Sequence, residues 1–304
     1  MDKKTTELYK DDLDNFPDYQ TYLENLEKLD KTDYSKMSYD EIYNLFYDLA
    51  CIIPSRFGFF NPIKFNSNHY FRVRLRKDIG ENEDLSLKQT FSYPPPSILH
   101  KNGRANLKYK TVFYCSNNPN TAILESKPEI GDEGYLSIWK GVATRKLKSS
   151  ICLPYNLTDK NEWHFASKDS FEELKKTLPE KAKDKYNHVI SLFKFVANKF
   201  VNEKEPYPLT SMISNELLYG RELWNDYILY PSILSDCKRC NIAFHPNIVN
   251  ENLDLEKIIE FRFGVNSEKS VEFGKVGYYH ENKLIWRKRN DDENYMFKIK
   301  KTSS

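Results

Sequence analysis

The chain has 304 residues, of which 39% are hydrophobic, 14% aromatic and 30% charged, with 46 lysines and arginines against 44 acidic residues. This balance is typical of globular proteins and excludes disorder, collagen and a coiled coil as descriptions of the whole chain. The net charge of +2 provides no overall field for nucleic acid or for an anionic membrane surface, so neither is expected as a partner.

The location of the protein is predicted from its apolar segments and its cysteines. No apolar run approaches the roughly 20 residues of a membrane helix, and the first residues lack the apolar region of a secretory signal. The five cysteines are odd in number and mostly isolated, which favours reduced thiols over a disulfide framework. We therefore expect a soluble, cytoplasmic protein.

The first 60 residues are predicted to form a helical N-terminal region. Residues 1–30 are polar and acidic, which predicts a helical segment that packs only loosely on the rest of the protein. Ser38 and Glu41 have the spacing of a capping box, which marks the start of a helix. Apolar residues then recur at helical spacing until Pro54 ends the run.

Residues 70–76 alternate strictly between apolar and basic side chains, which predicts a strand with Arg72, Arg74 and Arg76 on one face. Three guanidinium groups on one face repel one another unless water or an anion neutralises them. A pyrophosphate would do so, because arginine forms bidentate, charge-assisted hydrogen bonds with it. The alternative is an edge strand with a solvated basic face.

Helices and strands alternate irregularly along the rest of the chain. Strands are predicted at 111–115, 136–139, 227–230, 241–244 and 258–263, and a hairpin turns at Glu281-Asn282. Helices are predicted after the N-cap Asn118, over 160–203, and after Pro208. This order lacks regular βαβ units and favours an α+β fold, in which residues 251–304 supply strands that complete the core or pack on it.

Several familiar catalytic signatures are missing from the sequence. It contains no G-x-G-x-x-G, no Walker A loop, no H-E-x-x-H and no G-x-S-x-G. Cys237 and Cys240 have the spacing of half a zinc site, but no second pair of ligands lies nearby. We therefore predict no metal site.

A set of short segments in a fixed order resembles the RES domain, a family named for its arginine, glutamate and serine. The segments cover roughly residues 65 to 250: Phe71-Arg72-Val73-Arg74, Gly103-Arg104-Ala105-Asn106, Val112-Phe113-Tyr114, Thr121-Ala122-Ile123-Leu124-Glu125, Ile228-Leu229-Tyr230-Pro231-Ser232 and Asn241-Ile242-Ala243-Phe244. Tyr109 and the stretch from Cys237 to Cys240 depart from the family, which usually has glycine there. The resemblance implies an ADP-ribosyltransferase-like RES core at residues 61–250.

The resemblance also implies NAD as the substrate, with no cofactor or metal. Known members are toxins of toxin–antitoxin modules that destroy NAD by hydrolysis or phosphorolysis, or that ADP-ribosylate a target. Glu125, Arg72 and Ser232 would be catalytic, and Arg104, Tyr114 and Arg74 would bind the substrate. The chemistry of these side chains agrees with such roles, because cleavage of the nicotinamide–ribose bond needs stabilisation of an oxocarbenium-like transition state by a carboxylate.

Three functions remain open at this point. The first is an NAD-consuming toxin or effector, and the second is an ADP-ribosyltransferase acting on a protein or nucleic acid. The third is a non-catalytic module that binds phosphate groups through its arginine-rich strand. An antitoxin or immunity protein and a second copy of the chain are candidate partners.

Overall fold

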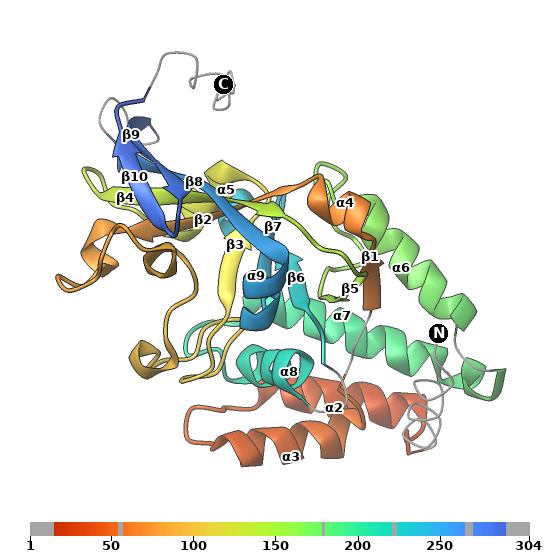
Figure 1. Ribbon diagram of the computed structural model, residues 1–304. Coiled ribbons are helices and arrows are strands. Elements are labelled where there is room, and N and C mark those ends of the chain that lie inside the picture. Colours follow the sequence, from red (N-terminus) through yellow and green to blue (C-terminus); the bar gives the residue numbers. More distant parts are fainter. Residues whose placement is uncertain (1–14, 54–56, 178–179, 221–223, 265–269, 290–304) are drawn as a thin grey trace.

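The computed structural model describes residues 15–53, 57–177, 180–220, 224–264 and 270–289, which form an α+β structure built on one sheet (Figure 1). The described helices are α2 (Tyr19–Lys31), α3 (Tyr39–Ala50), α4 (Pro62–Asn66), α5 (Pro119–Glu125), α6 (His164–Thr177), α7 (Tyr186–Asn202), α8 (Pro208–Tyr219) and α9 (Pro246–Asn252). The described strands are β1 (Phe57–Phe60), β2 (His69–Leu75), β3 (Phe113–Ser116), β4 (Glu133–Gly141), β5 (Leu147–Ile151), β6 (Tyr227–Pro231), β7 (Cys240–Phe244), β8 (Leu253–Phe263), β9 (Val271–His280) and β10 (Lys283–Arg287).

The sheet consists of two halves that meet at one residue pair. Its order is β1-β5-β6-β7-β3-β2-β4-β8-β9-β10, and the pairing of β2 with β3 is limited to Phe71 and Ser116. Figure 1 shows the consequence, because β2 and β4 run across the molecule while β3, β6 and β7 run steeply to them. The connection between β2 and β3 is therefore a seam where two strand directions meet.

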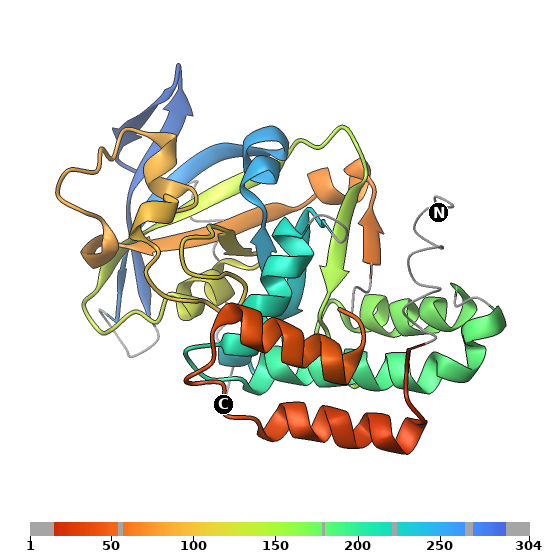
Figure 2. The same ribbon diagram turned by 90° about the horizontal axis from the view of Figure 1, so that it is seen from below.

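The N-terminal helices belong to the core of the protein. In α2, Tyr22 and Leu29 are fully buried, and the helix packs against α3 and α7. Figure 2 shows α2 and α3, in red and orange, lying against the neighbouring helices. The prediction of a helical segment is confirmed for residues 19–31, but the prediction that it is loosely held is wrong, because three apolar residues spaced by helical turns are enough to bury one face. Residues 1–14 lie outside the described part.

Local signals placed the next helix correctly. The Ser38 side chain accepts a hydrogen bond from the Glu41 backbone, and the Glu41 carboxylate accepts one from the Ser38 backbone, so the predicted capping box is present. The helix α3 ends at Ala50, and Pro54 falls outside the described residues.

A layer of helices covers one face of the first half of the sheet. The helix α7 lies within the predicted helical range 160–203, and its buried side chains share a cluster with Ile228, Tyr230 and Ala243 of β6 and β7. The helix α8 lies beside α7 and contributes fully buried residues to the same cluster.

The C-terminal strands extend the second half of the sheet. The strand β8 pairs with β4 along its length, and β9 and β10 continue outward as the predicted hairpin. Both turn residues, Glu281 and Asn282, have positive φ values of 47° and 67°, as a two-residue hairpin turn requires. The short helix α9 before β8 was not predicted. Among the helices of the described residues, none combines the length and the apolar character needed to cross a bilayer.

Candidate active site

The carboxylate of Glu125 and the hydroxyl of Ser232 are in direct contact, although 107 residues separate them in the sequence. Ser232 Oγ donates a hydrogen bond to Glu125 Oε1 at 2.5 Å. The Asn118 side chain caps the start of α5, and Glu125 is the last residue of that helix. Ser232 directly follows β6 and is fully buried. The two halves of the RES-like pattern therefore meet at this pair.

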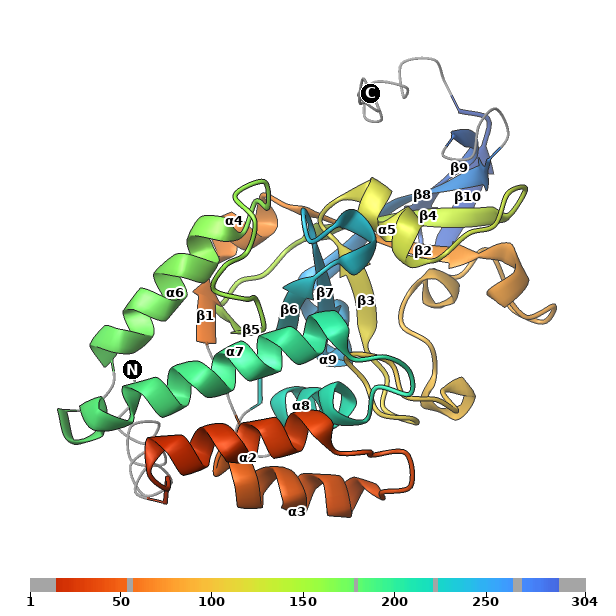
Figure 3. The same ribbon diagram turned by 180° about the vertical axis from the view of Figure 1, so that it is seen from behind.

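The loop after β6 folds back on Ser232 and fixes its position. The backbone N–H of Ser232 donates to the carbonyl of Arg239 at 2.9 Å, and the N–H of Cys237 donates to the carbonyl of Ser232 at 2.9 Å. Asp236 and Cys237 have φ values of 52° and 57°, which are left-handed conformations that favour glycine. Figure 3 shows this loop next to α5.

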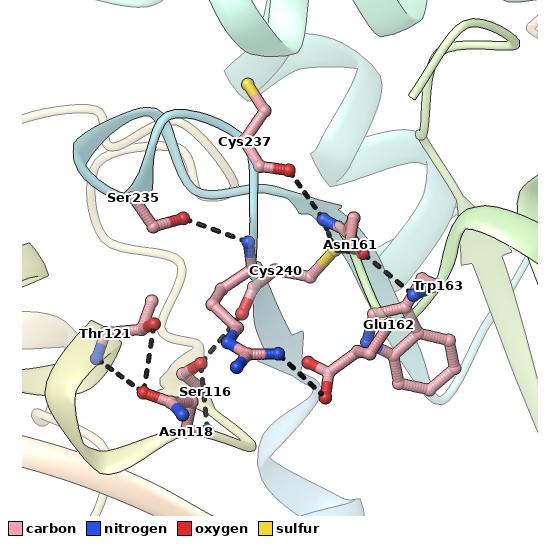
Figure 4. A network of polar contacts seen from close by, with 10 residues as sticks. Ser116, Asn118, Thr121, Asn161, Glu162, Trp163, Ser235, Cys237 and Cys240 are labelled. Atoms are coloured by element: carbon pink, nitrogen blue, oxygen red, sulfur yellow. Dashed lines mark hydrogen bonds and ion pairs between the residues drawn. The ribbon is translucent and has the colours of Figure 1, made fainter. Parts of the chain in front are cut away.

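A network of polar contacts ties that loop to its surroundings (Figure 4). Asn161 is buried, and its Nδ2 donates to the carbonyl of Cys237 at 2.7 Å while its Oδ1 accepts from the N–H of Trp163 at 2.8 Å. The hydroxyl of Ser116 donates to the carbonyl of Cys240 at 2.8 Å and accepts from the N–H of Asn118. Ser116 therefore links the end of β3, the start of α5 and the start of β7.

The two cysteines of this loop take part in packing. The Cys240 thiol is buried beside the Asn161 side chain, and burial raises the pKa of both Cys237 and Cys240, so they stay protonated. Among residues with a described placement, no group of three or more potential ligands could hold a metal ion.

Tyr114 closes the tight turn that carries Arg104. Its hydroxyl donates to Asn106 Oδ1 at 2.8 Å and accepts from the N–H of Ala105 at 2.8 Å. A Cβ atom on Gly103 would lie 2.4 Å from Asn106 Oδ1 and 2.7 Å from the Tyr114 hydroxyl, so only glycine fits there. Burial raises the pKa of Tyr114, which keeps the phenol neutral. Tyr114 therefore positions this turn, whereas the resemblance implied that it binds the substrate.

Arg104 is held by a backbone carbonyl and an aromatic ring, not by a carboxylate of the described residues. Its Nη1 donates to the carbonyl of Phe200 at 2.7 Å, and its guanidinium lies 4.7 Å from the ring centre of Tyr207. Within the described ranges Arg104 forms no ion pair. The remaining donors can therefore bind an anion. Tyr207, which has a φ of 55°, was not identified from the sequence because its partner lies far away in the chain.

Arg72 lies at the seam between the two halves of the sheet. Its Nε donates to the carbonyl of Ser92 at 3.0 Å, its Nη1 donates to the carbonyl of Tyr114 at 3.1 Å, and its guanidinium lies 5.5 Å from the Phe113 ring centre. Burial and the neighbouring Arg74 lower the pKa of Arg72 to about 10, so it remains charged at neutral pH. In the part of the chain that the structure describes, Arg72 makes no hydrogen bond or ion pair with Glu125 or Ser232 and instead supports the strand that carries Tyr114.

The prediction that Arg74 binds the substrate is not supported by its contacts. Its guanidinium forms two hydrogen bonds with the carboxylate of Glu83, at 2.5 and 2.6 Å, and two more with the carbonyls of Thr90 and Asp78. The arginine in turn holds the pKa of Glu83 below its usual value. The repulsion expected along this strand is thus relieved by an internal carboxylate, so no bound anion is required.

Comparison of the chain with models of protein families, with curated proteins and with solved structures finds no match. Its function therefore has to be inferred from the geometry of the site.

Proposed function

We propose that the protein cleaves the nicotinamide–ribose bond of NAD, by hydrolysis or phosphorolysis, and so depletes the cofactor. The observation that carries this proposal is the contact between Glu125 Oε1 and Ser232 Oγ. It holds a carboxylate in one orientation against the buried residue Ser232.

Cleavage of the nicotinamide–ribose bond needs a negative charge beside the ribose and does not need a general acid. Nicotinamide leaves as a neutral molecule with the electron pair of the broken bond, and positive charge develops on the ribose. The Glu125 carboxylate would stabilise that charge, and a hydrogen bond from Ser232 would keep it correctly oriented. Water or phosphate then forms the new bond to the ribose carbon, and water releases its proton to solvent or to Glu125.

Arg104 would bind the pyrophosphate of NAD. Its charge has no carboxylate partner within the described ranges, and its turn is fixed by Tyr114 and by the close packing at Gly103. Arg72 would stabilise the seam and add positive potential. These roles differ from those implied by the resemblance, which assigned Arg72 to catalysis and Tyr114 to substrate binding.

Features of the backbone support an ADP-ribosyltransferase-like RES core. Tyr109, at a φ of 62°, and Cys237, at 57°, have left-handed conformations at positions where the family usually has glycine. The two halves of the sheet also join at one pair near the proposed site. In this proposal the protein is a cytoplasmic toxin or effector, and an antitoxin or immunity protein would restrain it.

Transfer of ADP-ribose to a macromolecule is the second candidate. Leu124, Ile233 and Leu234 are 36%, 40% and 46% exposed, and each lies within two residues of Glu125 or Ser232 in the sequence. A macromolecular acceptor would cover this apolar surface, whereas water would not. A non-catalytic phosphate-binding strand is less well supported, because Arg74 and Arg76 already have carboxylate partners.

The test is incubation of the purified protein with NAD, with and without phosphate, followed by identification of the products. We expect release of nicotinamide, with free ADP-ribose from hydrolysis and ADP-ribose phosphate from phosphorolysis. Glu125→Gln should reduce turnover at least 100-fold while the melting temperature stays close to that of the wild type. Glu133→Gln, a change at an exposed carboxylate outside the site, is the matched control. Absence of nicotinamide release by the wild type, or undiminished turnover by Glu125→Gln, would refute the proposal.

A further inference from the structure

Tyr230 lies within the candidate site, although neither the motif nor its chemistry singled it out. It precedes Ser232 by two residues in β6, and only 4% of its surface is exposed. Tyr230 pairs with Asn241, which pairs with Ser116 on its other side, so these three side chains share one face of the sheet. Tyr114 lies on the same face, two residues before Ser116.

The ring and the hydroxyl of Tyr230 have different surroundings. The ring packs on Phe200 with 5.4 Å between ring centres, and the carbonyl of Phe200 is the group that holds Arg104. The ring is therefore held by packing on Phe200. The hydroxyl, by contrast, makes no hydrogen bond with any residue that the structure describes.

An unpaired hydroxyl on a buried tyrosine is unusual in this protein. The hydroxyls of other buried tyrosines donate to backbone carbonyls, namely those of Tyr22, Tyr34 and Tyr70. The Tyr230 hydroxyl is not among the fully enclosed, unpartnered polar atoms of the described residues, so it reaches the protein surface and is accessible to a ligand. Burial, together with the neighbouring Tyr114 and Glu125, raises the pKa of Tyr230, while Arg104 opposes the rise. The phenol is therefore neutral and able to donate.

We propose that the Tyr230 hydroxyl binds a hydroxyl of the nicotinamide ribose of NAD. The inference rests on the proposed function and follows from the order of groups in the substrate. The ribose hydroxyls lie between the carbon whose bond breaks, which Glu125 would face, and the pyrophosphate, which Arg104 would bind. Tyr230 precedes Ser232, the partner of Glu125, by two residues, and its ring packs on Phe200, whose carbonyl holds Arg104. Its hydroxyl is the part left available.

The test compares Tyr230→Phe with Tyr227→Phe, a change at a buried tyrosine on the opposite face of the same strand. Steady-state kinetics would be measured with NAD and with analogues lacking the 2′- or the 3′-hydroxyl of the nicotinamide ribose. We expect Tyr230→Phe to lower kcat/KM for NAD by 10- to 100-fold. The same change should cost less than 3-fold with the analogue that lacks the bonded hydroxyl. Tyr227→Phe should leave kcat/KM within 3-fold of the wild type for every substrate.

The melting temperature supplies a second readout. Because the Tyr230 hydroxyl has no protein partner, Tyr230→Phe should keep or raise the melting temperature, which separates a binding role from a structural one. A wild-type enzyme that turns over NAD, together with a Tyr230→Phe variant of equal kcat/KM, would overturn this inference alone. So would an equal loss with NAD and with both deoxy analogues. A wild type that does not turn over NAD would overturn the proposed function and, with it, this assignment.

Discussion

The substitution Gly103→Ala tests whether the turn before Arg104 is as closely packed as its geometry indicates. The added methyl would lie 2.4 Å from Asn106 Oδ1 and 2.7 Å from the Tyr114 hydroxyl, and both distances are well inside van der Waals contact. Both atoms belong to the hydrogen bonds that close the turn, so they cannot move away without breaking these bonds. Two buried hydrogen bonds at about 1–1.5 kcal/mol each give a loss of about 2–3 kcal/mol in the free energy of unfolding.

That loss can be measured by thermal unfolding. For a protein of this size it corresponds to a decrease in melting temperature of roughly 3–5 °C. The KM for NAD should also rise, because the turn places Arg104. The matched control is Gly80→Ala, where the nearest atom to the new methyl would be 3.7 Å away and the melting temperature should change by less than 2 °C. If Gly103→Ala melts at the temperature of the wild type, the reasoning about this turn is wrong.

Two further predictions concern the helix layer and the loop that carries Ser232. Burial lowers the pKa of His188 below its ordinary value of 6.5, so the folded protein binds the proton more weakly than the unfolded chain. The protein therefore loses stability as the pH falls below about 6.5. His188→Gln should flatten the decrease in melting temperature between pH 7.5 and 5.5, and an unchanged slope would contradict this. Asn161→Ala removes the hydrogen bonds to the carbonyl of Cys237 and from the N–H of Trp163. It should lower the free energy of unfolding, measured in urea, by about 2 kcal/mol and should reduce NAD turnover. Full stability would show that the network of Figure 4 does not hold the loop.

Elements with local signals could be predicted from the sequence. The capping box of α3, the proline after the cap of α5 and the turn of the β9–β10 hairpin depend on residues within a few positions of one another. The helix α2 was underestimated because its stability comes from packing of Tyr22 and Leu29 on other helices, and a polar composition does not reveal that packing.

The residues of the candidate site also differ in how well the sequence predicts them. Glu125 and Ser232 were identified from the order of motifs, and the structure joins them. The ion pair between Arg74 and Glu83 could not be predicted, because Glu83 lies in an irregular connection where no periodicity indicates which side chains meet. The importance of Gly103 and the unpaired hydroxyl of Tyr230 depend on what lies across the fold, so they could not be derived from spacing alone.

The loops that carry Arg104 and Ser232 have a common design. Each contains non-glycine residues in left-handed conformations, Tyr109 in the first and Asp236 and Cys237 in the second. Such conformations cost about 1–2 kcal/mol each and persist only where surrounding contacts determine the backbone. Those contacts are present, since the N–H of Tyr109 donates to the carbonyl of Leu99 at 2.8 Å and the N–H of Cys237 donates to that of Ser232 at 2.9 Å. Loops held in this way keep a guanidinium and a hydroxyl fixed before any ligand arrives, as a site needs if it is to stabilise charge in a transition state.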